Sequence, residues 1–120
     1  MTRVLVVDDS ETVLLMLQRR LEMAGYDVAT ATDGQGALDG VAADPHPDIV
    51  LLDAMMPGMS GIEALQEMRA SGNNTPVLIV SAYRYGEEPD EAVRLGADGC
   101  VPKPFDWDEL VQRIEELAGA

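Results

Sequence analysis

Three short apolar runs constrain the fold of this chain more than any other feature. Residues 4–7, 49–52 and 77–80 are Val-Leu-Val-Val, Ile-Val-Leu-Leu and Val-Leu-Ile-Val, with no polar residue inside any of them. Continuous apolar runs rich in β-branched residues are typical of strands buried on both faces, and strands of this kind form parallel sheets. Two weaker strands are predicted at residues 27–31 and 98–101.

Amphipathic segments alternate with these strands. Apolar residues repeat at helical spacing from Val13 to Leu21, and Gly25 is expected to end that helix. Further helices are predicted over residues 35–43, from the capping box Ser60–Glu63 onward, over residues 87–95 and from Asp106 onward. The order is five strand–helix units, which predicts an α/β fold, (βα)5, with a doubly wound five-stranded parallel sheet covered by helices on both faces.

Composition limits the class of protein. The chain has 120 residues, enough for one domain, and 47% of them are hydrophobic, which argues against disorder. Eight basic residues against 22 acidic ones give a formal net charge of −14, which disfavours direct binding to nucleic acid or to an anionic membrane. A solvated surface or a high-salt cytoplasm would each explain this acidity. The chain also has seven arginines and only one lysine, a bias that a high-salt cytoplasm or a GC-rich genome would explain equally well. The single cysteine, Cys100, excludes an intramolecular disulfide, and without a membrane-length apolar run we expect a cytoplasmic protein.

Polar residues follow the predicted strands at one end of the sheet. Asp8 and Asp9 follow the first strand, Asp53 the third, Ser81 the fourth and Lys103 the fifth. Each alone has an ordinary explanation as a cap, a turn residue or a solvated charge, but the carboxyl ends of the strands are where open α/β sheets place their sites. Three close carboxylates repel one another unless a cation neutralises them, and Mg²⁺ prefers oxygen ligands. A lysine beside such a cluster indicates phosphoryl chemistry, with an aspartate as nucleophile.

These motifs, taken together and in order, closely resemble the receiver domain of bacterial and archaeal response regulators. The resemblance covers essentially the whole chain and rests on residues 4–10, 53–61, 81–82 and 103–105, with matching spacings of 53 − 9 = 44 and 103 − 81 = 22. It implies a flavodoxin-like receiver fold with strand order 2-1-3-4-5. It also implies a two-component signalling switch and not an enzyme, with only self-catalysed phosphorylation and dephosphorylation.

The resemblance implies a role for each acidic residue. Asp53 would be the phosphoacceptor, receiving a phosphoryl group from a histidine kinase or a phosphotransfer protein. Asp9 would ligate Mg²⁺ directly, and Asp8 would act mainly through a water. Asp53 and the backbone carbonyl of Met55 would complete the protein ligands.

Residues after the last two strands would carry the switch. Lys103 would pair with a phosphoryl oxygen. Ser81 would swing its hydroxyl onto the phosphate and pull its loop along, and Ala82 would belong to the same phosphate-binding switch. The peptide bond between Lys103 and Pro104 is typically cis in this family. Cys100 departs from the pattern, because it replaces the aromatic residue that commonly turns inward on activation.

Two variable positions bear on how long the signal lasts. Met55 stands two residues after the acceptor and Tyr83 two after the serine, where side chains tune hydrolysis of the aspartyl phosphate. Neither carries a carboxylate or amide that could orient a water, so slow autodephosphorylation is expected. Gly58 and Gly61 fit the loop after the acceptor, where the backbone approaches closely or takes a positive φ, although Gly61 is equally compatible with a simple helix start.

The resemblance leaves partners and organisation open. We expect residues 1–120 to form a single receiver domain with no output domain, either a stand-alone regulator or a piece of a longer protein. A downstream protein would dock on the face made by the helix predicted over residues 87–95, the strand at residues 98–101 and the helix from Asp106 onward, and the same face could form a weak homodimer. Other functions considered are a Mg²⁺-dependent phosphohydrolase, which usually has a second Asp where Met55 stands, a flavodoxin-like cofactor binder, and a scaffold that is never phosphorylated.

Overall fold

The computed structural model describes residues 2–43, 45–54, 56, 58–81, 96–102 and 106–118, with the backbone alone for Ser81 and Pro102. Five strands form one parallel sheet in the order β2-β1-β3-β4-β5. The strands are β1 (Arg3–Val7), β2 (Asp27–Ala31), β3 (Ile49–Asp53), β4 (Val77–Ser81) and β5 (Gly99–Pro102). The predicted fold class and strand order are therefore confirmed.

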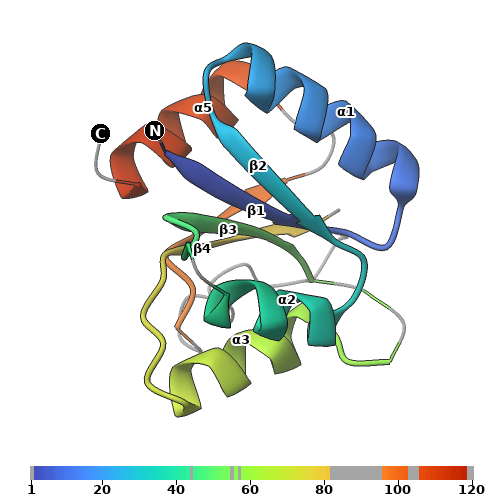
Figure 1. Cartoon of the computed structure of the whole chain (residues 1–120), viewed down its shortest axis with the longest axis vertical. Coiled ribbons are helices and arrows are strands. Elements are labelled where there is room, and N and C mark those ends of the chain that lie inside the picture. The colour runs from blue at the N-terminus through green and yellow to red at the C-terminus, as the bar shows by residue number, and fades with distance from the viewer. Residues whose placement is uncertain are drawn as a thin grey trace.

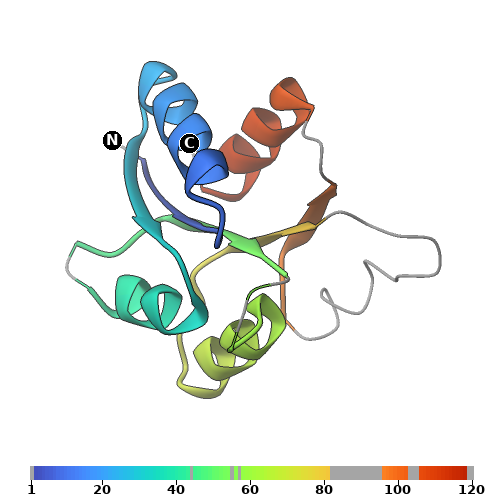
Figure 2. The same ribbon diagram turned by 90° about the vertical axis from the view of Figure 1, so that its right-hand side faces the viewer.

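Helices cover both faces of the sheet. Figures 1 and 2 show α1 (Glu11–Met23) and α5 (Trp107–Leu117) on one side, and α2 (Gly34–Ala42) and α3 (Gly61–Ala70) on the other. The helix predicted over residues 87–95 lies outside the described residues. Among the helices that the structure describes, none combines the length and the apolar character that a membrane span requires.

The sheet separates two hydrophobic cores. Leu5 and Val7 pack with α2 and α3, whereas Val4 and Val6 pack with α1 and α5, because successive side chains of a strand point to opposite faces. All five residues of β3 are buried. The continuous apolar runs thus become central strands with both faces covered, as the sequence predicted.

Polar side chains fix the starts of the helices. Ser10 caps α1 by accepting from the Val13 N–H at 3.3 Å, and Ser60 caps α3 by accepting from the Glu63 N–H at 3.2 Å. Asp33 and Asp106 cap α2 and α5 in the same way. Gly25, with φ 98°, follows the end of α1 as predicted, since this left-handed conformation favours glycine.

The last strand begins one residue later than predicted. Asp98 precedes β5, and its backbone N–H donates to the Val77 carbonyl at 2.8 Å. Its side-chain Oδ2 accepts from the Val77 N–H at 2.9 Å and pairs with Arg69 at 3.2 Å. Asp98 therefore acts as a connector between β4 and α3 rather than as the first strand residue.

Arg69, at the end of α3, joins segments that are distant in the sequence. Its Nε donates to the Gly96 carbonyl at 2.9 Å, and its Nη1 donates to the carbonyls of Asn73 and Thr75 at 3.0 and 2.9 Å. With the Asp98 ion pair, one planar guanidinium reaches four acceptors. This arrangement holds the α3–β4 connection against the start of β5, at the end of the sheet away from Asp53.

We expect Arg69→Lys to lower the free energy of unfolding by about 1–3 kcal/mol, because an ammonium cannot reach all these acceptors and leaves carbonyls without their donor. Urea denaturation measures this loss. Arg19→Lys, at an exposed position on α1, is the matched control and is expected to change stability by less than about 0.5 kcal/mol. Equal stability of wild type and Arg69→Lys would contradict the structural role given to Arg69.

Candidate functional site

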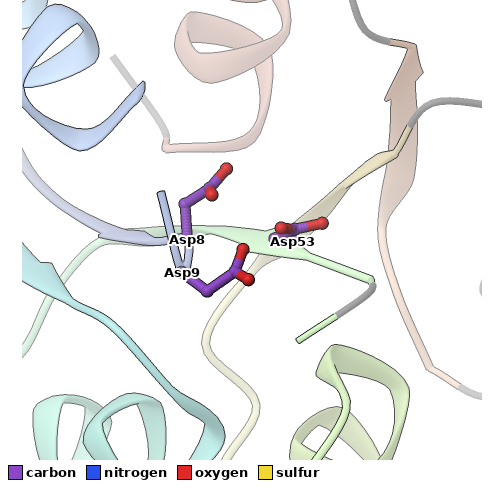
Figure 3. Close-up of side chains that lie close together, drawn as sticks. All are labelled: Asp8, Asp9 and Asp53. Carbon is purple, nitrogen blue, oxygen red and sulfur yellow. The ribbon is translucent and has the colours of Figure 1, made fainter. Parts of the chain in front are cut away.

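Three carboxylates meet beyond the ends of β1 and β3. Asp8 and Asp9 directly follow β1, and Asp53 is the last residue of β3. The two strands are adjacent and parallel, with Val7 beside Leu52, so their ends lie at the same edge of the sheet. One carboxylate oxygen from each aspartate lies within 4.8 Å of the others, and Figure 3 shows the three side chains together. The predicted convergence of Asp8, Asp9 and Asp53 is thus what the structure shows.

Burial differs among the three aspartates. Asp8 and Asp53 are 3% and 7% exposed, whereas Asp9 is exposed to solvent. Buried acidic residues are uncommon unless they are paired or coordinate a metal. The cluster offers hard oxygen donors from two buried groups and one open group, which fits a cation such as Mg²⁺ that keeps several of its waters.

Backbone groups fix the position of Asp8. Its own N–H donates to the Ala31 carbonyl of β2 at 3.1 Å, and its Oδ1 accepts from the Ser10 N–H at 2.9 Å. Ser10 is also the N-cap of α1, so neither Asp8 nor Asp9 is needed for that role. The sequence analysis missed Ser10, although a serine just before an apolar helical pattern is a recognised N-cap signal.

Neighbouring backbone holds Asp53 from two sides. Asp53 is in register with Val80, and the next residue, Ala54, donates its N–H to the Val80 carbonyl at 3.2 Å. The Ala54 carbonyl accepts from the Gly61 N–H at 3.2 Å, which ties the start of α3 to the end of β3. The backbone that carries the Asp53 side chain is therefore hydrogen-bonded, through Ala54, to both β4 and α3.

Two glycines have different roles around this loop. Gly58 has φ 74°, a conformation that side chains rarely adopt. A Cβ on Gly61 would lie 1.9 Å from the Asp53 carbonyl oxygen. Gly58 is required by its backbone conformation and Gly61 by a close approach, so Gly61 is more than a tolerated helix start.

The remaining predicted site residues are described less fully. Ser81 ends β4 and pairs in register with Pro102, which places its backbone at the same edge of the sheet as Asp53. Met55, Ala82, Lys103 and Pro104 lie outside the described residues, as do the Ser81 side chain and Tyr83. Cys100 is half-buried on β5, and its side chain packs against the core shared with α2 and α3.

The sequence is similar to proteins of one known family along nearly its whole length. The model of the family Response regulator receiver domain matches residues 4–115. The chain is 46% identical over 118 residues to the regulatory protein AtoC of Escherichia coli, covering 96% of this chain and 25% of AtoC. It spans about a quarter of the length of AtoC and about half that of the mycobacterial regulators named MprA that it also matches.

Solved structures agree with the sequence match. The receiver domain of the Francisella response regulator 1452 has a TM-score of 0.90 at 35% identity, covering 98% of this chain and 97% of that one. The response regulator TrrA of Thermotoga maritima, solved in complex with Mg²⁺ and BeF, has a TM-score of 0.86 at 34% identity, covering 98% and 99% of the two chains. Receiver domains of this kind are signalling switches of two-component systems rather than classical enzymes. This chain belongs to the response-regulator receiver domain family.

Proposed function

We propose that this domain accepts a phosphoryl group on Asp53, in a Mg²⁺-dependent reaction, from the phosphohistidine of a histidine kinase or phosphotransfer protein. The observation that carries the proposal is the cluster of Asp8, Asp9 and Asp53 at the ends of two adjacent strands, where Asp53 is the last residue of β3. Receiver domains bind Mg²⁺ at an acidic cluster, and they interact with histidine kinases and output targets.

The donor set fits a hard divalent cation. Asp8, Asp9 and Asp53 would hold it, together with the backbone carbonyl of Met55. Bound Mg²⁺ would offset the negative charge of the carboxylates and of the incoming phosphoryl group. Asp8 is buried and one of its oxygens accepts from the Ser10 N–H, so the orientation of that carboxylate is restricted.

The proposed transfer forms one bond and breaks another. A carboxylate oxygen of Asp53 attacks phosphorus, the bond between phosphorus and the histidine nitrogen breaks, and the imidazole leaves with that electron pair and takes up a proton. Asp53 is 7% exposed, so its surroundings limit access of bulk water to the acceptor. A single carboxylate fixed at a strand end is suited to this displacement because its backbone is held by β4 and α3.

The response to phosphorylation is proposed from the sequence resemblance. Lys103 would pair with a phosphoryl oxygen, and the Lys103–Pro104 bond would be cis. The Ser81 hydroxyl would swing onto the phosphate and pull its loop, with Ala82 part of the same phosphate-binding switch. New charge-assisted contacts of this kind shift a two-state equilibrium. Cys100 replaces the usual aromatic residue, so this switch would work without that ring.

We also propose where this domain acts and which partners it contacts. Residues 1–120 would act as one receiver domain in the cytoplasm. Its output would pass to a protein docked on the face of the helix predicted over residues 87–95, β5 and α5, or to a second copy through that face, without direct contact with nucleic acid. The high negative charge of −14 supports the last point.

Acetyl phosphate with Mg²⁺ should add one phosphoryl group to the wild-type protein, as measured by intact mass. Asp53→Asn should gain none, because an amide oxygen is a far weaker nucleophile than a carboxylate. Chelation of Mg²⁺ should reduce labelling at least about 100-fold. The matched control is Asp39→Asn, an exposed acidic position on α2, which should label like wild type.

Two results would contradict this assignment. One is equal labelling of wild type and Asp53→Asn, which would place the acceptor elsewhere. The other is a wild-type protein that neither accepts phosphoryl from acetyl phosphate nor binds beryllofluoride, which would favour a scaffold. Continuous release of phosphate with many turnovers per minute would instead favour a phosphohydrolase.

The phosphorylated protein should decay slowly, with a half-life of minutes or longer. Met55 and Tyr83 carry no group that could orient an attacking water, and Met55→Asn should shorten the half-life several-fold by supplying one. The decay of the phosphorylated mass after removal of acetyl phosphate measures both. A wild-type half-life of a few seconds would show that these two positions do not limit hydrolysis.

A further inference from the structure

We propose that Gly61 is a positioning residue of the acceptor site. Its lack of a side chain lets the start of α3 close directly onto the backbone of Asp53, and this closure sets where the Asp53 carboxylate lies relative to Asp8 and Asp9. The inference rests on the proposed function, because it concerns the geometry of the same metal and acceptor site.

The surroundings of Gly61 differ from those of the other helical glycines. A Cβ there would lie 1.9 Å from the carbonyl oxygen of Asp53, 2.8 Å from its carbonyl carbon and 3.0 Å from the Ala54 Cα. All three atoms belong to the backbone of the acceptor segment. At Gly34 and Gly40, by contrast, the nearest atoms belong to the side chains of Met59 and Leu5.

Hydrogen bonds hold the two backbones at this distance. The Gly61 N–H donates to the Ala54 carbonyl at 3.2 Å, and Ser60 caps the same helix turn through the Glu63 N–H. Ala64, one turn further along α3, is fully buried in the core beside the sheet. The start of α3 is therefore anchored by packing as well as by the contact with Ala54.

A methyl group at position 61 cannot be accommodated by rotating a side chain. Ordinary contacts of a Cβ lie at 3.4 Å or more, so either α3 or the Asp53 backbone would move by more than an ångström. Displacements of that size in a reacting group can cost about 100-fold in rate. Mg²⁺ is also sensitive, because it demands near-octahedral geometry from its ligands.

The test is a measurement of Mg²⁺ affinity. The affinity is obtained from the change in the amide chemical shift of Ala54 in two-dimensional NMR titrations of the full chain with Mg²⁺. Gly61→Ala should bind Mg²⁺ at least about 10-fold more weakly than wild type and should be labelled by acetyl phosphate about 100-fold more slowly. Gly40→Ala is the matched control: it also adds a methyl to a helical glycine, but against the flexible end of Leu5. It should keep the wild-type affinity within about two-fold.

The outcomes separate this inference from the function on which it rests. A wild-type protein that does not bind Mg²⁺ overturns the proposed function. A wild-type protein that binds, with a folded Gly61→Ala variant of the same affinity, overturns the role of Gly61 alone. A loss of thermal stability without a change in Mg²⁺ affinity would likewise make Gly61 merely structural.

If Gly61→Ala does not fold, the titration of the wild-type protein with Mg²⁺ still tests whether Gly61 is coupled to the site. Because the Gly61 N–H is bonded to the Ala54 carbonyl, its amide signal should shift with Mg²⁺ and saturate with the same dissociation constant as that of Ala54. The Gly40 amide should not move. A Gly61 signal that stays in place while Ala54 shifts would overturn the coupling.

Discussion

Mutual repulsion among Asp8, Asp9 and Asp53 is the constraint on which the rest of this structure depends. Their oxygens lie within 4.8 Å of one another, and two of the three residues are buried. Two unit charges 4 Å apart interact by about 1 kcal/mol in water and about 4 kcal/mol at the effective dielectric constant found near protein surfaces. A fold that keeps these carboxylates together must hold them in place with rigid neighbouring groups. It must also offset their repulsion with stabilising interactions elsewhere in the domain.

Backbone groups supply several of these supports. Asp8 is held by the Ala31 carbonyl and the Ser10 N–H, and Asp53 by the contacts of Ala54 with β4 and α3. Backbone supports suit a switch because they position the carboxylates without placing additional side chains that would compete with them for the cation. The stabilisation comes from strands with both faces buried and from connections such as Arg69, which lie away from the charged edge.

Much of this arrangement could be predicted from the sequence, for local reasons. The run at residues 49–52 is continuous and apolar, so it predicts a central parallel strand, and the edge rule for parallel sheets then places Asp53 beside Asp8 and Asp9. Ser60 and Gly25 were also predictable, since caps depend on residues three or four positions away.

Other features depend on tertiary placement and could not be predicted. Arg69 pairs with Asp98, 29 residues away in the sequence, just before β5 begins at Gly99. The sequence left open whether Gly61 marks a close backbone approach or a simple helix start. The packing of α3 on the sheet decides for the close approach to Asp53. Cys100, by contrast, was correctly placed on the last strand from the sequence.

The most direct test of the charged cluster is the free energy of unfolding of wild type and Asp53→Asn, measured with urea in the absence and presence of Mg²⁺. Without the ion, we expect Asp53→Asn to be the more stable protein, because one of three repelling charges is gone. With Mg²⁺ at about 100 times its dissociation constant, wild type should gain about 2.7 kcal/mol and the variant much less. Equal gains, or a wild type that is indifferent to Mg²⁺, would contradict a cation site at Asp8, Asp9 and Asp53.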